Sequence, residues 1–168
     1  CGWGRLLFAH TFADPADLVA AFREEARDQR DIAMYLRDPH VVLSLAPQEL
    51  FLDPSHTFRL WLDQYRPAHT PPKGFVVRRL NPTEDLDQVN RILGARGMVK
   101  LEPGFMHSNT RARELSFLVA TNATTGAVTG FTMGVDHKRA FEDPEQGSSL
   151  WSLAVDPQAS APGVGEAL

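Results

Sequence analysis

A proline-rich stretch divides this chain into two parts and limits what each part can fold into. Arg66–Gly74 (RPAHTPPKG) holds three prolines and one glycine in nine residues. Proline lacks a backbone N–H and fixes φ, so such a stretch neither continues a helix nor forms a central strand. We therefore expect a small N-terminal module at residues 1–66, a linker at 67–73 and a second domain at 74–168.

Composition excludes several classes of protein. Of the 168 residues, 43% are hydrophobic and 23% are charged, which is typical of a folded chain and not of a disordered one. The net charge of −4 gives no basic field for nucleic acid, and no apolar run approaches the ~18 residues that span a membrane. Cys1 is the single cysteine, which excludes an internal disulfide and suits the cytoplasm. The six histidines lack the spacing of metal ligands, so we expect no metal site.

The first part has the pattern of a small α/β module. Asp14 followed by Pro15 is typical of a helix start, with Leu18, Val19 and Phe22 on one face. Three apolar segments favour strands, the last two separated by a turn at Asp38-Pro39: Arg5–Thr11, Ile32–Leu36 and Val41–Leu45. The segments 49–51 and 57–62 are compatible with strand or helix.

The second part has a clearer pattern. Gly74–Leu80 favours a strand, and apolar residues at helical spacing predict a helix from Asn81 to Arg96. A weaker segment spans 103–113, and the turn residues 122–126 predict a hairpin between strands at 115–121 and 127–135. A polar loop at 136–149 would then precede a third strand at 150–155.

The segment after that strand is the most informative motif in the chain. Leu153–Leu168 reads as a strand, a turn with Gly163-Val164-Gly165, and the first turn of a helix. Glycine lets the backbone turn tightly and approach a ligand, while the free N–H groups of a first helical turn favour phosphate. An ordinary strand-to-helix turn is the alternative interpretation.

From about Gly74 to Leu168, the sequence resembles the GNAT family of acyl-CoA-dependent N-acyltransferases. The resemblance is carried by Val155 and Pro157 at the end of the strand and by Gly163 and Gly165 at the spacing of the family's diphosphate loop. The family pattern has Arg or Gln where this chain has Ser160, and Pro162 removes a further N–H. The resemblance implies an α/β (α+β) fold in which a mixed sheet with flanking helices follows the N-terminal module. Because the chain starts without Met and ends inside the motif, we also expect an incomplete and inactive fragment.

The resemblance also implies the site. Acetyl-CoA would bind along the strand and the turn, at Leu153, Ala154, Val155, Ser160, Gly163, Val164, Gly165 and Glu166. Family members often carry a catalytic carboxylate on this strand, but residues 150–155 are not acidic. The nearest carboxylates are Asp136, Glu142, Asp143 and Glu145, and we choose Asp136 as the general base because a strand end is held more rigidly.

The order of the parts, with Gly147–Trp151, is similar to acetyltransferases associated with N-acetylglutaminylglutamine amide biosynthesis, an osmoprotectant. That likeness implies acetyl transfer to the amine of a small molecule or of glutaminylglutamine. The alternative is a non-catalytic acyl-CoA sensor, which the altered Ser160 and Pro162 positions favour. A third interpretation is that the N-terminal module serves assembly, through contact with a partner enzyme or with a second copy in a homodimer.

Overall fold

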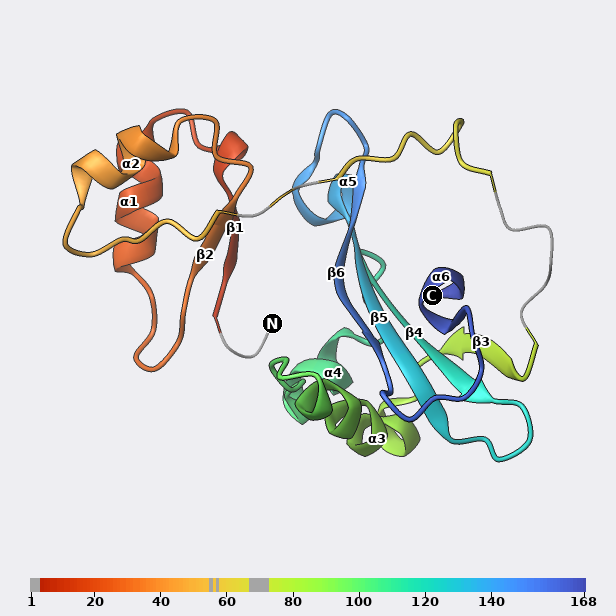
Figure 1. Ribbon diagram of the computed structural model, residues 1–168. Coiled ribbons are helices and arrows are strands. Elements are labelled where there is room, and N and C mark those ends of the chain that lie inside the picture. Colours follow the sequence, from red (N-terminus) through yellow and green to blue (C-terminus); the bar gives the residue numbers. More distant parts are fainter. Residues whose placement is uncertain (1–3, 55, 57, 67–72) are drawn as a thin grey trace. The chain divides into compact units, whose positions relative to one another are not determined.

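Two separate sheets organise the chain, one in each of its parts (Figure 1). The computed structural model describes residues 4–54, 56, 58–66 and 73–168. The chain divides into two units, Cys1–Pro67 and Ala68–Leu168. The linker that we expect at 67–73 lies outside the described residues except for Lys73.

The N-terminal unit combines a two-stranded parallel sheet with two helices. Its elements are β1 (Leu6–Phe8), a 3-10 turn (Ala9–Thr11), α1 (Pro15–Arg23), β2 (Ile32–Met34) and α2 (Pro39–Leu45). The start of α1 is as predicted, because the Asp14 carboxylate accepts a hydrogen bond from the N–H of Ala16. The strands predicted at Arg5–Thr11 and Ile32–Leu36 are present, but each has only three residues in the sheet.

α2 shows that one strand prediction was wrong. Val41–Leu45 is helical, although its apolar, β-branched start favours a strand. Pro39 occupies the first turn of α2, where its fixed φ is compatible with a helix and its missing N–H costs nothing. Val42 and Ala46 then lie four residues apart and pack with Leu18 and Val19 of α1. Tertiary packing thus decided between helix and strand.

The C-terminal unit is a four-stranded antiparallel sheet with helices. Its elements are β3 (Phe75–Arg79), α3 (Pro82–Ala95), α4 (Pro103–Asn109), β4 (Leu115–Asn122), β5 (Val128–Asp136), α5 (His137–Phe141), β6 (Ser148–Val155) and α6 (Val164–Ala167). The strand order is β3-β4-β5-β6. The predicted strand at 74–80, the helix from Asn81 and the hairpin are confirmed.

The predicted loop at 136–149 is wrong in two respects. Its first half forms α5, and β6 already begins at Ser148. The side chain of Asp136 accepts a hydrogen bond from the N–H of Arg139, which caps the start of this short helix. The loop also contains Glu142 and Gln146 in the left-handed backbone region, so it turns tightly.

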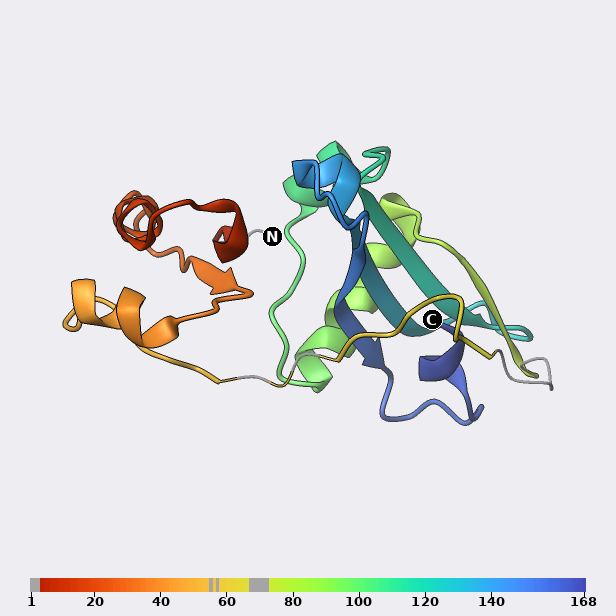
Figure 2. The same cartoon turned by 90° about the horizontal axis from the view of Figure 1, so that it is seen from above.

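The two faces of the sheet carry different helices (Figures 1 and 2). On one face, the apolar side of α3 packs with α4, and its buried residues include Val89, Ile92 and Leu93. On the other face, Val164 of α6 packs against Phe75 and Ala120. Successive residues of a strand point to opposite faces, and here one face meets α3 while the other meets α6. The sheet is therefore covered by helices on both faces near α6.

The strand register defines two ends of the sheet. At one end, Val155 of β6 pairs with Gly130, and the chain continues into the turn before α6. At the other end, Ser148 pairs with Asp136, next to α5. The seven steps from Ser148 to Val155 correspond to roughly 23 Å at the usual rise of a strand.

Candidate active site

The turn between β6 and α6 presents free backbone donors. Gly163 has φ of 82°, a left-handed conformation that favours glycine, and a Cβ at this position would meet open space. Among the described residues, the amide groups of Gly163, Val164 and Gly165 have no hydrogen-bond acceptor. These three donors follow one another at the start of a helical turn, which is the arrangement that binds phosphate oxygens.

The turn packs closely on the end of β6. Val155, Val164 and Ala161 share one apolar cluster with Phe75. A Cβ on Gly165 would lie 3.4 Å from Cγ2 of Val155, at the near limit of ordinary van der Waals contact. The end of the strand and the glycine turn therefore pack against each other.

Arg91 of α3 and Arg96, the residue that caps the end of that helix, donate hydrogen bonds to the start of the turn. Arg91 Nη2 donates a hydrogen bond to Asp156 Oδ2 at 2.6 Å, and Arg96 Nε donates to the carbonyl oxygen of Val155 at 2.8 Å. Asp156 Oδ1 accepts a further bond from the N–H of Gln158. The bond from Arg91 lowers the pKa of Asp156 below its ordinary value, while burial opposes the change. Asp156 is thus held as a carboxylate that positions the first residues of the turn.

β6 is the last strand of the sheet and contains an irregularity. Its pairing with β5 shifts between Met133 and Gly134, so that Trp151 is the extra residue opposite them. In the described part of the chain no further strand pairs with the other edge of β6. Its side chains Leu150 and Leu153 are 59% and 39% exposed. A bulge beside an unpaired edge is a common setting for a binding site.

The predicted cofactor residues fall into three sets. The structure brings together Val155, Gly163, Val164 and Gly165 at the turn. Leu153 and Ala154 precede them on β6, with Leu153 exposed and Ala154 buried. Ser160 and Glu166 are exposed, and the structure records no contact that joins them to the group.

Asp136, the predicted base, lies at the opposite end of β6 from the glycine turn. Besides capping α5, its carboxylate Oδ2 lies 3.6 Å from Nε of Arg139. The side chain is 39% exposed. Asp136 therefore has a structural role that the sequence did not indicate, and its role as a base stays a prediction.

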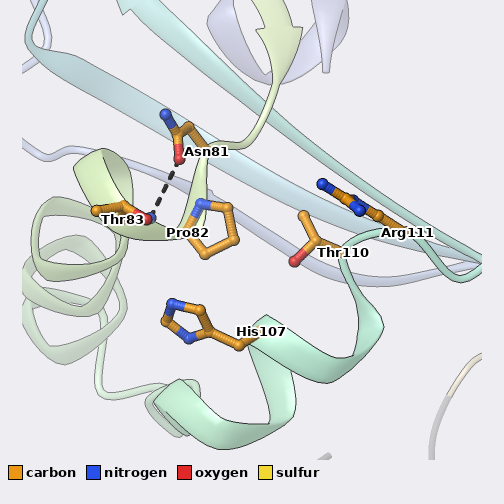
Figure 3. Close-up of a pocket in the computed structure, with 6 residues that line it drawn as sticks. All are labelled: Asn81, Pro82, Thr83, His107, Thr110 and Arg111. Carbon is orange, nitrogen blue, oxygen red and sulfur yellow. Dashed lines mark hydrogen bonds between the residues drawn. The ribbon is translucent and has the colours of Figure 1, made fainter.

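A pocket of about 380 Å³ lies between the start of α3 and the end of α4. Figure 3 shows His107 and Thr110 facing the start of α3, with Arg111 beyond Thr110; the pocket is lined by Asn81, Pro82, Thr83, His107, Thr110 and Arg111. His107 Nδ1 lies 2.8 Å from the carbonyl oxygen of Pro103, which leaves Nε2 toward solvent. No ion pair joins Arg111 to a carboxylate among the residues that the structure describes. The pocket thus offers a cationic group and an imidazole to a ligand.

Sequence reasoning missed this pocket. Its residues come from two helix ends about 25 positions apart, and neither end carries a recognisable motif. The register places it at the Asp136 end of the sheet, since Arg79 at the end of β3 pairs toward the start of β4. The segment just after the pocket is also linked to α5, because Arg139 Nη1 donates a hydrogen bond to the carbonyl oxygen of Arg113.

Two features are absent from the parts of the chain that the structure describes. No group of three or more His, Cys, Asp or Glu side chains is arranged to hold a metal ion. No helix in residues 4–54, 56, 58–66 and 73–168 has the length and apolar character to cross a membrane.

Comparison with known proteins gives weak structural likenesses. No family model and no curated protein matches the chain. Among solved structures, an acetyltransferase of Trypanosoma brucei aligns with 56% of this chain and 68% of its own, at 19% identity and a TM-score of 0.43. A GNAT family acetyltransferase of Staphylococcus aureus aligns with 56% of this chain and 71% of its own, at 12% identity and a TM-score of 0.41.

Proposed function

We propose that this chain is a GNAT-type N-acetyltransferase that uses acetyl-CoA. The supporting observation is the end of β6, where a strand edge that no further described strand pairs with is followed, after the turn at 156–162, by three consecutive amides without an acceptor at Gly163–Gly165. The GNAT resemblance also implies a strand, two helices, a hairpin and a fourth strand before the glycine turn, and β3, α3, α4, β4, β5 and β6 follow this order, with the short helix α5 added between β5 and β6.

Different parts of β6 and of its turn would bind different parts of acetyl-CoA. The amides of the turn would bind the diphosphate of acetyl-CoA, and the free edge of β6 would pair with the pantetheine arm as an added strand would. A backbone N–H near the bulge at Trp151 would donate to the thioester oxygen as negative charge develops on it. Acetyl-CoA would supply the activated acyl group.

The acceptor would enter from the end of the sheet near α5. The pocket with His107 and Arg111 lies at that end, and a guanidinium binds a carboxylate well. We infer that the acceptor is a small amine that also carries a carboxylate. A dipeptide such as glutaminylglutamine meets this description, in agreement with the likeness at Gly147–Trp151.

The proposal is tested by a pair of variants at Gly163. Asn and Asp are the residues that tolerate the left-handed region best, so both keep the backbone of the turn. Gly163→Asn adds an amide, whereas Gly163→Asp adds a negative charge beside the proposed diphosphate. Calorimetry should give acetyl-CoA affinity within a few-fold of the wild type for the first variant and at least about tenfold weaker for the second. Equal affinity in both variants would contradict diphosphate binding at this turn.

The sensor alternative predicts a different result. The exposed Ser160 and the missing N–H of Pro162 leave fewer donors than the family pattern has, which fits a binding module as well as an enzyme. A sensor would bind acetyl-CoA but produce no CoA thiol with any amine. Continuous thiol detection over a panel of amino acids and dipeptides separates the two functions.

A further inference from the structure

Three polar side chains meet where α5 and its loop pack on the start of β6. His137 Nε2 lies 2.5 Å from Oγ of Ser149, and His137 Nδ1 lies 3.6 Å from Oδ2 of Asp143. The imidazole and the carboxylate are buried, with side-chain exposures of 9% and 8%. A hydroxyl, an imidazole and a carboxylate in this order are a recurrent arrangement for moving a proton.

The loop fixes this cluster through backbone contacts. Asp143 Oδ1 accepts a hydrogen bond from the N–H of Glu145, and Oδ2 accepts one from the N–H of Gly147. The N–H of His137 donates to the carbonyl oxygen of Gly147, and the Phe141 ring lies against the imidazole with centroids 4.9 Å apart. The positions of the imidazole and the carboxylate are therefore set before any ligand binds.

The surroundings indicate which nitrogen carries the proton. Nδ1 faces a carboxylate that is held in place by two N–H groups, so a proton on Nδ1 is favoured there. Nε2 then accepts the hydrogen bond, and Ser149 donates its hydroxyl proton. Two neighbouring charged groups have partners of their own, since Asp136 pairs with Arg139 and Lys138 donates to Gln146.

Ser149 is also well placed for the proposed reaction. It belongs to β6, the strand along which the thioester would lie, and it is followed by the exposed Leu150. It lies toward the end of the sheet at which the acceptor would enter. Resting on the proposed acetyl transfer, we propose that Ser149, His137 and Asp143 form the proton relay that deprotonates the acceptor amine, in place of Asp136, whose carboxylate caps α5.

In the proposed reaction, the relay takes one proton from the amine and passes it to solvent. The amine nitrogen forms a bond to the thioester carbonyl carbon, and the bond between that carbon and sulfur breaks. The amine gives one proton to Ser149 Oγ while the hydroxyl proton of Ser149 moves to His137 Nε2. The imidazolium, stabilised by the Asp143 carboxylate, then releases a proton to solvent, and the departing CoA thiolate takes one up. Ser149 touches the reacting amine, and His137 and Asp143 position and support it.

Kinetics of matched variants test the relay. Ser149→Ala and His137→Gln should each lower kcat about 100-fold and leave the calorimetric affinity for acetyl-CoA unchanged. Ser149→Thr keeps the hydroxyl and should restore most of the rate, and Ser148→Ala on the exposed neighbour should equal the wild type. Full activity of Ser149→Ala would overturn the relay while leaving acetyl transfer intact.

A measurement without substrates tests the same relay independently. Long-range ¹H–¹⁵N spectra of the wild-type protein should show neutral His137 protonated on Nδ1, and Ser149→Ala should shift the Nε2 resonance. A proton on Nε2 in the neutral form would overturn the proposed direction of transfer.

Mass spectrometry tests a competing route. An acetyl group found on Ser149 during turnover would contradict the relay and indicate covalent catalysis by Ser149. If the wild type binds no acetyl-CoA, the proposed function itself fails, and the relay fails with it.

Discussion

Arg91 of α3 and Asp156, the first residue after β6, form a 2.6 Å hydrogen-bonded ion pair across 65 positions of sequence. Asp156 is almost fully buried, whereas the Arg91 side chain is half exposed. Asp156→Asn should lower the free energy of unfolding by about 1–2 kcal/mol, because a charge-assisted bond is lost but solvent screens part of it. Urea unfolding measures this change.

The Arg23–Glu49 pair provides the control for that prediction. It has a similar 2.7 Å geometry, but both of its side chains are about half exposed. Glu49→Gln should therefore destabilise the protein less than Asp156→Asn. Equal losses in the two variants would mean that burial of Asp156 adds nothing to the pair.

Three buried carboxylates predict the response to acid. Burial alone would raise the pKa of Asp85, but hydrogen bonds from Arg78 and from the N–H of Asn81 outweigh burial and lower the pKa. Hydrogen bonds from Arg5 lower the pKa of Asp31 in the same way. With Asp156, these groups bind protons more weakly in the folded state than in the unfolded chain, so they stabilise the fold above their ordinary pKa of about 3.9. That stability should be lost as pH falls below about 4. Urea unfolding from pH 7 to pH 3 should show the loss, and Asp85→Asn should make the dependence on pH shallower.

Gly130 and Gly134 of β5 provide a matched pair that tests the packing of α6. A Cβ on Gly130 would lie 2.7 Å from Leu168 Cδ1 and 2.8 Å from Val164 Cγ1, whereas one on Gly134 would have no neighbour closer than 3.7 Å. Gly130→Ala should displace α6, cost about 1–3 kcal/mol and weaken acetyl-CoA binding. Gly134→Ala should change neither property appreciably. Normal affinity in Gly130→Ala would show that α6 does not need this position to form the site.

Arg111 should determine the preference for acceptors that carry a carboxylate. Arg111→Ala should raise KM about tenfold for a carboxylate-bearing acceptor, since a charge-assisted bond contributes about 1.5–3 kcal/mol and this one is partly exposed to solvent. For the methyl ester of the same acceptor, the variant and the wild type should have equal KM. An equal rise in KM for acid and ester would exclude carboxylate recognition by Arg111.

Local signals were enough to predict much of the C-terminal unit. Asn81 caps α3, and Asn122 accepts the N–H groups of Thr124 and Thr125 in the hairpin turn, as turn and cap residues in the sequence indicate. These predictions succeed because the deciding interactions lie within a few residues. Val41–Leu45 failed for the opposite reason, since packing on α1 outweighed strand propensity.

The candidate site likewise contains one part that local sequence predicts and one part that depends on tertiary contacts. The glycine turn was visible as a motif, because Gly163 is needed for its local backbone conformation. The cluster of His137, Asp143 and Ser149 carried no such signal: its members meet only because α5 and the left-handed residue Glu142 fold the loop back onto β6. Contacts of that kind depend on the tertiary fold and not on spacing.

The central claim is that the amides of Gly163, Val164 and Gly165 bind the diphosphate of acetyl-CoA. Two-dimensional amide NMR during titration with acetyl-CoA tests it most directly. The account predicts that these three resonances move most and shift downfield, as expected when N–H groups gain phosphate acceptors, while the amides of the hairpin turn at Asn122–Gly126 stay in place. A titration that leaves the three resonances unmoved, or that moves the hairpin turn more, would contradict the claim.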